Sequence, residues 1–129
     1  MAFGQVQTVR VSGTSYQQEI IKFFVDRYPD SRLHGDPSED EQPWPATLRM
    51  ILIPEPTNKF DKNAVCVTLP RDSQLLALGF LPSDLAPIYQ PWVRAADEGG
   101  LACPGYFVGG HDERPTVGVR IQLPILPTS

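Results

Sequence analysis

The stretch Glu55-Pro56-Thr57-Asn58-Lys59-Phe60-Asp61-Lys62-Asn63 separates two apolar runs, residues 50–53 and residues 64–69. Short apolar runs bounded by Asn, Asp and Pro predict β-strands joined by a bend. A simple hairpin would need only an Asn-Gly or Asp-Gly pair at this point. The longer bend adds an aromatic ring, an acceptor carboxylate and two lysines, a combination that suits a nucleotide. The alternative is a polar loop whose Asn and Asp side chains bond their own backbone.

Outside this bend, further short strands are predicted at residues 6–11, 47–54, 75–81, 101–108 and 116–123. A helix is predicted over residues 16–28, because the apolar residues there recur at helical spacing and Pro29 follows. Two short, kinked helical turns are predicted after Pro82, since Pro87 and Pro91 disfavour one regular helix. A mobile loop over residues 109–115 is expected between the last two strands.

These elements predict a mainly β fold with one or two short helices. Strands this short expose their edges unless the sheet closes, so the expected arrangement is a small OB-like β-barrel. A chain of 129 residues is enough for one domain, taken here as residues 1–129. The segment 29–46 is rich in proline and acid, and we expect it to form an exposed excursion.

The net charge of −4 is confined to one part of the chain. The acidic excursion accounts for all of it, and the remainder is neutral. A neutral body can bind a strand end locally, but it is not expected to coat long duplex, which requires many phosphate contacts. No apolar run reaches the ~20 residues of a membrane span, and the start of the chain lacks signal-peptide regions. We therefore expect no membrane partner and a cytoplasmic location (nucleoid-associated, or nuclear in a eukaryote).

Motifs for catalysis or metal binding are absent from the sequence. There is no Gly-x-Ser-x-Gly elbow, no His-Glu-x-x-His motif and no phosphate-binding P-loop. Asn58, Asp61 and Asn63 resemble the opening of a calcium loop, but the central glycine and the closing glutamate are missing. Cys66 and Cys103 form no Cys-x-x-Cys pair. The sequence thus predicts no catalytic residue, no metal and no cofactor.

The bend resembles the signature segment of the HIRAN domain family, a small β-rich module. Members of this family occur at the N-terminal end of some Swi/Snf-type DNA-repair ATPases and as stand-alone prokaryotic proteins. Three further pieces follow in the family's order, together spanning roughly residues 9–123: Val11-Ser12-Gly13-Thr14-Ser15-Tyr16, Leu78-Gly79-Phe80-Leu81-Pro82 with Leu85-Ala86, and the region around Gly109-Gly110. The resemblance implies a modified OB-like barrel that captures the 3′-hydroxyl end of single-stranded DNA.

The resemblance also implies roles for individual residues. Tyr16 and Phe60 would flank the terminal base, and Asp61 would accept a hydrogen bond from the 3′-hydroxyl. The other implied DNA-binding residues would meet the last phosphates, add positive charge or complete the bend and its surroundings. They are Thr14, Ser15, Gln17, Asn58, Lys59, Lys62 and Phe80.

The residues themselves allow other roles. Tyr16 could simply begin a helix, Phe60 could plug an end of the barrel, and Asp61 could cap its own turn. The chain also departs from its DNA-binding relatives at three positions. Ser15 stands where they carry arginine, Ser83 where they carry lysine and Phe80 where they carry histidine. Lys62 and Arg71 are the cations that could compensate.

The expected function is therefore a non-enzymatic, DNA-binding module that recognises 3′ ends of single-stranded DNA. It would assist a helicase, nuclease or repair ATPase in DNA repair or replication-fork processing. The alternative is a protein-interaction module on the same barrel, without DNA binding, that uses the acidic excursion as its docking surface. A metal-dependent nuclease would require a carboxylate cluster that the sequence does not display.

Overall fold

A computed structural model of the chain describes residues 5–33, 46–96, 100–111 and 114–126. Within these residues the strands are β1 Val6–Arg10, β2 Arg32–Leu33, β3 Leu48–Pro54, β4 Val65–Arg71, β5 Gln74–Phe80, β6 Leu101–His111 and β7 Arg114–Pro124. The α-helices are α1 Gln18–Arg27 and α2 Ala86–Arg94, and the short 3-10 helices are η1 Thr14–Gln17 and η2 Pro29–Ser31. The predicted mainly β fold with short helices is confirmed.

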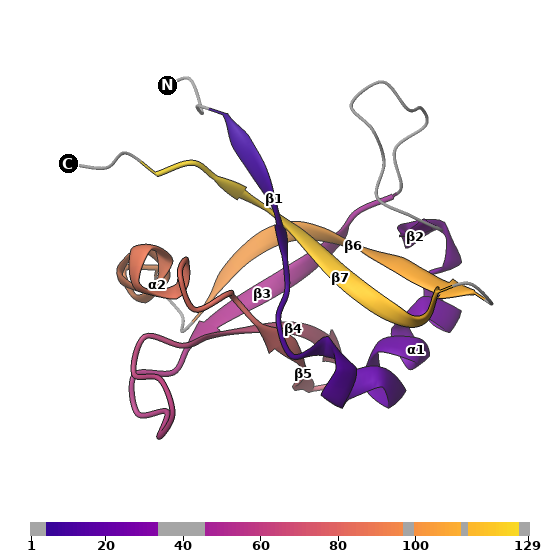
Figure 1. Ribbon diagram of the computed structural model, residues 1–129, viewed down its shortest axis with the longest axis horizontal. Coiled ribbons are helices and arrows are strands. Elements are labelled where there is room, and N and C mark those ends of the chain that lie inside the picture. The colour runs from indigo at the N-terminus through magenta and orange to yellow at the C-terminus, as the bar shows by residue number, and fades with distance from the viewer. Residues whose placement is uncertain (1–4, 34–45, 97–99, 112–113, 127–129) are drawn as a thin grey trace.

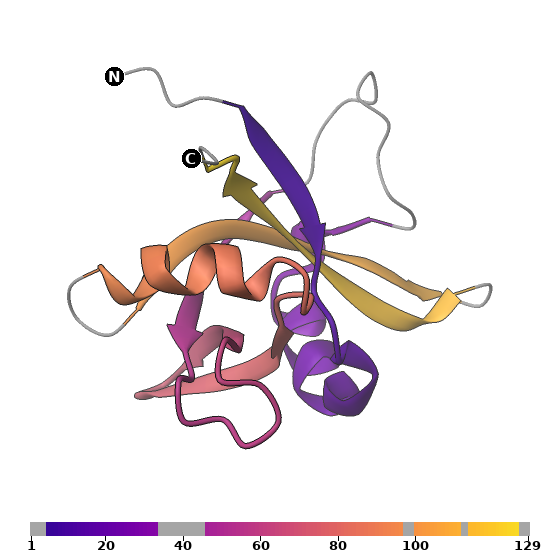
Figure 2. The ribbon, with the colours of Figure 1, turned by 60° about the vertical axis from the view of Figure 1, so that its left-hand side comes forward.

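The strands form one sheet in the order β1-β7-β6-β3-β4-β5, with antiparallel neighbours throughout this path. β2 joins β6 as a parallel neighbour. Ser12, two residues after β1, pairs with Phe80, the last residue of β5. The first and last strands of the order therefore meet, and the strongly coiled sheet closes as a small barrel-like fold (Figures 1 and 2).

The core occupies the inside of this closed sheet. Alternate residues of a β-strand point to the same face of the sheet, although β4 is buried on both faces over residues 65–69. In β7 the fully buried residues are Val117, Val119, Ile121 and Leu123, and in β4 they include Val65, Val67 and Leu69. The helix α1 adds Ile21 and Phe24, both buried at helical spacing on its inner face.

The helices lie on opposite sides of the barrel in Figure 1. Helical structure begins at Thr14, but its first turn is the 3-10 helix η1, and α1 follows it to Arg27. The two kinked turns predicted after Pro82 are wrong, because α2 is a single helix with Pro91 inside it. Pro87 lies in the first turn, where backbone N–H groups have no intrahelical partner. Pro91 therefore removes only one bond, to the carbonyl of Pro87.

The predicted excursion over residues 29–46 begins too early. Pro29–Ser31 forms η2, Ser31 is buried, and Arg32 and Leu33 of β2 pair with Phe107 and Val108 of β6. The Arg32 Nη1 atom donates a hydrogen bond to the Gly109 carbonyl oxygen over 2.8 Å. The chain is thus packed onto the barrel as far as Leu33. The rest of the excursion, residues 34–45, lies outside the described residues.

The long loop predicted over residues 109–115 is also wrong. β6 continues to His111 and β7 already begins at Arg114, and these two residues pair. Gly109 and Gly110 have φ angles of 96° and 84°, and the register shifts between Gly109 and His111. Glycine adopts this left-handed backbone without a steric penalty, so the pair forms a bulge within the strand instead of ending it.

Candidate nucleic-acid interface

The bend between β3 and β4, here called the 55–64 loop, is held together by its own polar side chains. The Asn58 Oδ1 atom accepts hydrogen bonds from the backbone amides of Phe60 (2.9 Å) and Asp61 (3.1 Å). The Asn58 amide group donates to Glu55 Oε1 over 2.9 Å. Asp61 Oδ1 accepts from the Asn63 amide over 2.8 Å. Asn58 and Asp61 therefore do bond their own backbone, as one of the two interpretations of the sequence expects.

The base of this loop is anchored to the barrel. The Glu55 amide donates to the Ala64 carbonyl oxygen over 2.9 Å. From α2, the buried Gln90 donates through Nε2 to the carbonyl oxygens of Lys62 (2.8 Å) and Ala64 (3.1 Å). Bonds within the loop and at its base leave few of its backbone groups free to rearrange. The loop is thus a preorganised support for the side chains that it carries.

Phe60 projects from this support into solvent. Its side chain is 98% exposed, the highest exposed fraction among the large hydrophobic residues of the described chain. The alternative in which Phe60 plugs an end of the barrel is therefore wrong. A fully exposed ring contributes nothing to the core, and on a hydrogen-bonded loop it offers a flat apolar surface to a ligand.

A hollow of about 570 Å³ lies beside Phe60, and we call it the bend hollow. Its lining is mainly apolar with a few polar groups: Ser12, Asn58, Phe60, Asp61, Ala64, Phe80, Leu81 and Ser83. This volume is within the range of small-ligand sites, roughly 300–1,000 Å³. Among the described residues of the lining, Asp61 is the only charged one, so they combine two phenyl rings, one carboxylate and serine hydroxyls.

The bend hollow brings together part of the DNA-binding set predicted from the sequence. Asn58, Phe60, Asp61 and Phe80 all line it. The remaining predicted residues do not: Thr14, Ser15, Tyr16, Gln17, Lys59 and Lys62. The two lysines are exposed on the 55–64 loop, so they stand near the hollow without lining it.

The predicted residues of the N-terminal segment lie on η1, which begins two residues after Ser12. Tyr16 on this turn is 88% exposed. It does stand at the start of the helical segment, so both sequence interpretations of Tyr16 fit its position. In both views η1 and the 55–64 loop lie on the same lower side of the barrel (Figures 1 and 2).

Gln18, the first residue of α1, holds η1 against the barrel. Its Nε2 atom donates to the carbonyl oxygens of Thr14 and Val117, each over 2.9 Å. Its Oε1 atom accepts from the Val117 amide, also over 2.9 Å. This two-way bond to β7 fixes the turn that carries Tyr16.

Four lining residues of the hollow were not assigned a binding role from the sequence, namely Ser12, Ala64, Leu81 and Ser83. Ser12 reaches the hollow only because it pairs with Phe80 at the barrel seam. Leu81 donates its amide to the Val65 carbonyl oxygen over 3.0 Å, which brings the end of β5 beside Ala64. Neither pairing has a local sequence signal, since each joins segments far apart in the chain.

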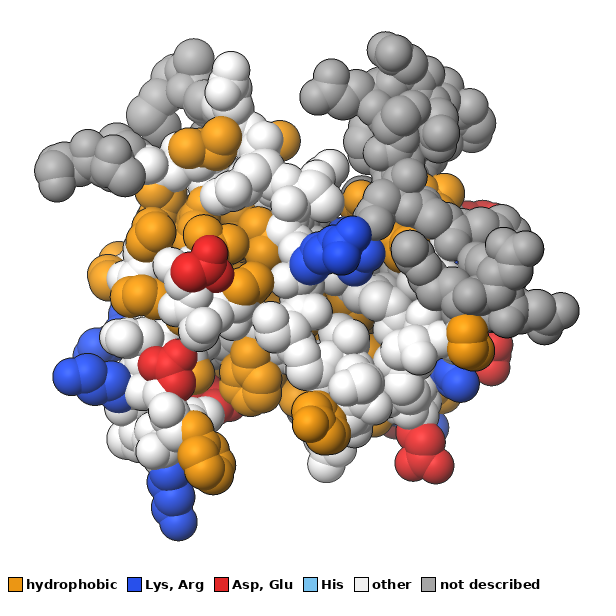
Figure 3. Space-filling view, in the orientation of Figure 1, with side chains coloured by type: hydrophobic (Ala, Val, Ile, Leu, Met, Phe, Trp, Pro, Cys, Tyr) orange, Lys and Arg blue, Asp and Glu red, His pale blue; other side chains and the backbone are white. Residues whose placement is uncertain are grey.

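Charged side chains are dispersed over the face shown in Figure 3, where lysines and arginines occur singly and alternate with acidic residues. Hydrophobic side chains protrude along the lower edge of this face, where Figure 1 places the 55–64 loop and η1. A dispersed charge pattern provides little attraction for a long phosphate backbone. Apolar side chains at an edge suit contacts with unstacked bases or with an apolar partner.

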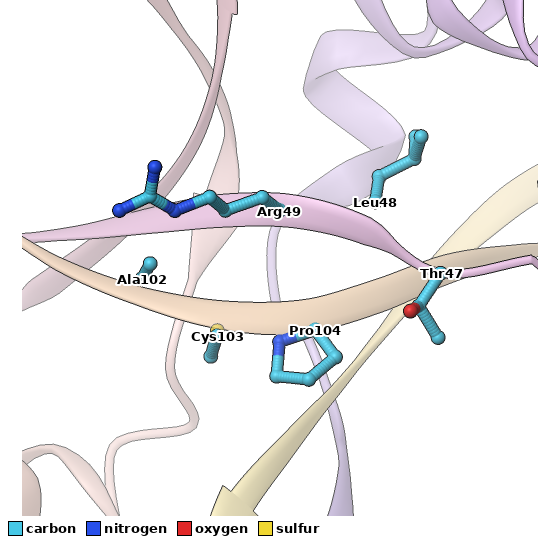
Figure 4. A pocket seen from close by; sticks show the side chains of 6 residues that line it. All are labelled: Thr47, Leu48, Arg49, Ala102, Cys103 and Pro104. Atoms are coloured by element: carbon cyan, nitrogen blue, oxygen red, sulfur yellow. The ribbon is translucent and has the colours of Figure 1, made fainter.

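A second hollow, of about 270 Å³, lies between β3 and β6 (Figure 4). It is lined by Thr47, Leu48, Arg49, Ala102, Cys103 and Pro104, all from these two paired segments. Arg49 extends along β3 in the close-up, and Pro104 is its register partner on β6. These described residues include no aromatic ring and no carboxylate, so they offer fewer means of recognising a ligand than the lining of the bend hollow does.

Both cysteines are buried and free. Burial raises the pKa of each thiol to about 12, and the nearby Glu55 carboxylate adds to the effect at Cys66. Each thiol therefore stays protonated and unreactive near neutral pH. Within the described residues, no three His, Cys, Asp or Glu side chains gather where they could hold a metal ion. The described part also has no helix long and apolar enough to cross a membrane.

No family model matches the chain, and no match is found among curated proteins or among solved structures. The resemblance to the HIRAN family therefore depends on the sequence motifs described above.

Proposed function

We propose that this chain is a non-enzymatic, HIRAN-type module that binds the 3′-hydroxyl end of single-stranded DNA in the bend hollow. The observation that supports this most directly is Phe60, 98% exposed on a hydrogen-bonded loop at the rim of an apolar hollow. Stacking of a base on an aromatic ring contributes about 1–3 kcal/mol and tolerates any sequence. Phe80, within the same hollow, gives the terminal base a second apolar contact.

Asp61 is the group that would recognise the end of the strand. One of its oxygens accepts the Asn63 amide, and a carboxylate has further lone pairs with which to accept a 3′-hydroxyl proton. A 3′-phosphate would meet the same carboxylate with like charge. In the part of the chain that the structure describes, no lysine or arginine lines the hollow to offset that repulsion. The proposed site therefore discriminates between a free and a phosphorylated 3′ end.

The composition of the hollow also predicts how salt affects binding. Ser83 belongs to the lining at a position where the DNA-binding relatives are expected to carry lysine, and Ser12 adds a second hydroxyl. Hydroxyls can bond phosphate oxygens, but they release no counterions from the strand. Affinity for a short end would thus come mainly from stacking and hydrogen bonds. In the cell, the module would act beside a helicase, nuclease or repair ATPase that supplies the catalysis.

The test is fluorescence anisotropy with a 5′-labelled ten-nucleotide strand that carries either a 3′-hydroxyl or a 3′-phosphate, with a blunt duplex beside it. The wild type should prefer the free hydroxyl. Asp61→Asn removes the charge and keeps an oxygen that can accept the Asn63 amide. This variant should therefore show a smaller difference in affinity between the 3′-hydroxyl and 3′-phosphate strands. Equal binding of both ends and the duplex by the wild type, or no binding at low salt, would overturn the proposal.

The exposed ring of Phe60 supports one other function, a protein-interaction module, because aromatic side chains beside a hollow are common anchors of protein interfaces. One comparison distinguishes DNA-end binding from protein docking. Under DNA-end binding, Phe60→Ala weakens strand binding by about 1–3 kcal/mol and leaves capture of a partner protein intact. Under protein docking through this ring, the variant loses the partner protein, and the wild type binds no strand.

A further inference from the structure

A third hollow, of about 300 Å³, lies where the end of α1 meets the turn between β4 and β5. We call it the arginine hollow. Its lining combines aromatic rings, two guanidinium groups and one carboxylate: Phe23, Phe24, Arg27, Tyr28, Pro70, Arg71 and Asp72. None of these residues belongs to the bend hollow. Of them, only Arg71 was considered for DNA binding from the sequence, as a cation that could compensate for the missing basic residues.

Arg71 is held in a defined orientation. Its guanidinium carbon lies 3.8 Å from the centroid of the Phe23 ring, a stacking contact between a cation and an aromatic face. Stacking uses the flat face of the guanidinium group and leaves the N–H groups on its edge available. Those edge groups form the planar fork that matches carboxylate and phosphate oxygens.

Arg27 adds a second guanidinium group on the exposed side of α1, one turn after Phe23. Among the described residues, neither Arg27 nor Arg71 has a hydrogen-bond or ion-pair partner. Asp72, at a φ of 56° in the turn, lines the same hollow without pairing with either. The hollow thus has a net positive charge and arginine donors that are free to bind an anion.

The arginine hollow and the bend hollow lie at opposite ends of the same two strands. Ala64, just before β4, and Phe80, at the end of β5, line the bend hollow. Arg71, at the end of β4, lines the arginine hollow. Seven residues in each strand, at ~3.3 Å per residue, separate the two hollows by about 20 Å.

The helices η1 and α1 link the segments that line the two hollows. η1 and α1 follow each other in the chain, and both contact β5. Tyr16, 88% exposed on η1, lies along the chain between Ser12 of the bend hollow and Phe23 and Arg27 of the arginine hollow. A strand that leaves the bend hollow along these helices would pass an exposed aromatic ring before it reaches the two arginines.

We propose that the arginine hollow is a second subsite, which binds a backbone phosphate of the same single strand whose 3′ end occupies the bend hollow. This inference rests on the proposed function. At ~3.4 Å per nucleotide in a stacked strand, 20 Å corresponds to about six nucleotides. OB-like barrels bind about 4–16 nucleotides, so the spacing is compatible with one strand on one barrel. Tyr28, 39% exposed in the same hollow, adds a ring that suits a base better than it suits an acidic peptide.

The experiment compares a ten-nucleotide strand, which spans both hollows, with a dinucleotide, which reaches only the bend hollow. Both probes carry a free 3′-hydroxyl. Anisotropy measures the longer probe, and ¹H–¹⁵N chemical shifts measure the weaker binding of the dinucleotide and show that each variant is folded. The variants are the double substitution Arg27→Gln with Arg71→Gln, and the control Arg94→Gln, an exposed arginine on α2 that lines neither hollow.

The double variant should lose roughly eightfold in affinity for the ten-nucleotide strand per lost phosphate contact at 50 mM salt. Its slope of log affinity against log salt should become shallower by about 0.7 per contact. Dinucleotide affinity should not change, and Arg94→Gln should bind both probes like the wild type.

The proposal is overturned if the double variant binds the longer strand as tightly as Arg94→Gln does, while both probes still bind the wild type. That outcome leaves DNA-end capture standing. Failure of the wild type to bind either probe removes the proposed function together with this subsite. A poly-glutamate peptide that binds the wild type and not the double variant, with strand binding equal in both, would assign the hollow to an acidic protein instead.

Discussion

Ser12 and Phe80 exchange two backbone hydrogen bonds: the Ser12 amide donates to the Phe80 carbonyl oxygen over 2.7 Å, and the Phe80 amide donates to the Ser12 carbonyl oxygen over 2.9 Å. This pair is the seam at which the first and last strands of the sheet meet. Both residues also line the bend hollow. Closure of the barrel and formation of the candidate site therefore depend on the same contact.

Gly79→Ala should damage both the fold and the site. A Cβ atom at position 79 would lie 2.3 Å from the Ser12 carbonyl oxygen and 2.7 Å from Val11 Cγ1. Because the first contact is with backbone, the seam itself must shift, at a cost of about 1–3 kcal/mol in the free energy of unfolding. Urea unfolding measures this loss, and strand affinity should fall in parallel.

Gly13→Ala is the control for this substitution. Its added Cβ meets nothing within 4 Å, but the φ of 78° strains any side chain there, at about 1 kcal/mol. If Gly79→Ala is no less stable than Gly13→Ala, the backbone at the Ser12–Phe80 pair can move to accept the added Cβ atom, and the expected loss of stability is wrong.

Gln90→Leu should loosen the 55–64 loop. The substitution removes the bonds from Gln90 Nε2 to the carbonyl oxygens of Lys62 and Ala64. The Lys62 carbonyl oxygen then loses its donor beside α2, whereas the Ala64 carbonyl oxygen keeps the bond from the Glu55 amide. We expect a loss of about 1–3 kcal/mol in the free energy of unfolding. Amide hydrogen exchange should also become faster at Asn63 and Ala64, and base stacking on Phe60 should weaken. The exposed Gln74→Leu on β5 is the matched control, and equal effects of the two would exclude an anchoring role for Gln90.

Phe60→Ala should weaken binding of a single strand without lowering the stability of the fold. Because the side chain is 98% exposed, its removal should change the free energy of unfolding by less than about 0.5 kcal/mol. Loss of one stacking contact should weaken binding of a single strand by about 1–3 kcal/mol, as measured by anisotropy. Ile88→Ala, at a 47% exposed position on α2, is the control for removing surface apolar area and should bind normally. Unchanged binding by Phe60→Ala would remove this ring from the site.

Because of the buried thiols, the free energy of unfolding should depend on pH in the alkaline range. Burial raises the pKa of Cys66 and Cys103 to about 12 from the ordinary 9.0, so the folded state holds these protons more tightly than the unfolded state does. Their contribution to stability is complete below about pH 9 and declines as the pH rises towards 12. Urea unfolding at pH 8 and pH 10.5 should show a larger loss in the wild type than in a Cys103→Ala variant. A thiol reagent at pH 8 should react with both cysteines only after unfolding, and rapid reaction of the folded protein would contradict their burial.

Local chemistry was sufficient for much of this structure. Apolar runs and their periodicity located β4, β5 and the helical segment that contains Ile21 and Phe24. Asn58 and Asp61 determine the bend that they cap, because an Asn or Asp side chain reaches the backbone amides two or three residues further along. The error at α2 arose from treating Pro87 and Pro91 as equal helix breakers, although only Pro91 removes a bond that the helix would otherwise form.

Tertiary structure alone decided the rest, because the deciding contacts join residues that are distant in the chain. The Ser12–Phe80 seam, the pairing of β2 with β6 and the stacking of Arg71 on Phe23 have no signature in any short window of sequence. An aromatic residue such as Phe60 fits a core and a binding surface equally well by type. Phe60 is exposed because the closed barrel places the tip of the 55–64 loop in solvent. The residues themselves determined the strands, the turns and the chemical groups available, whereas long-range packing determined which of those groups face one another.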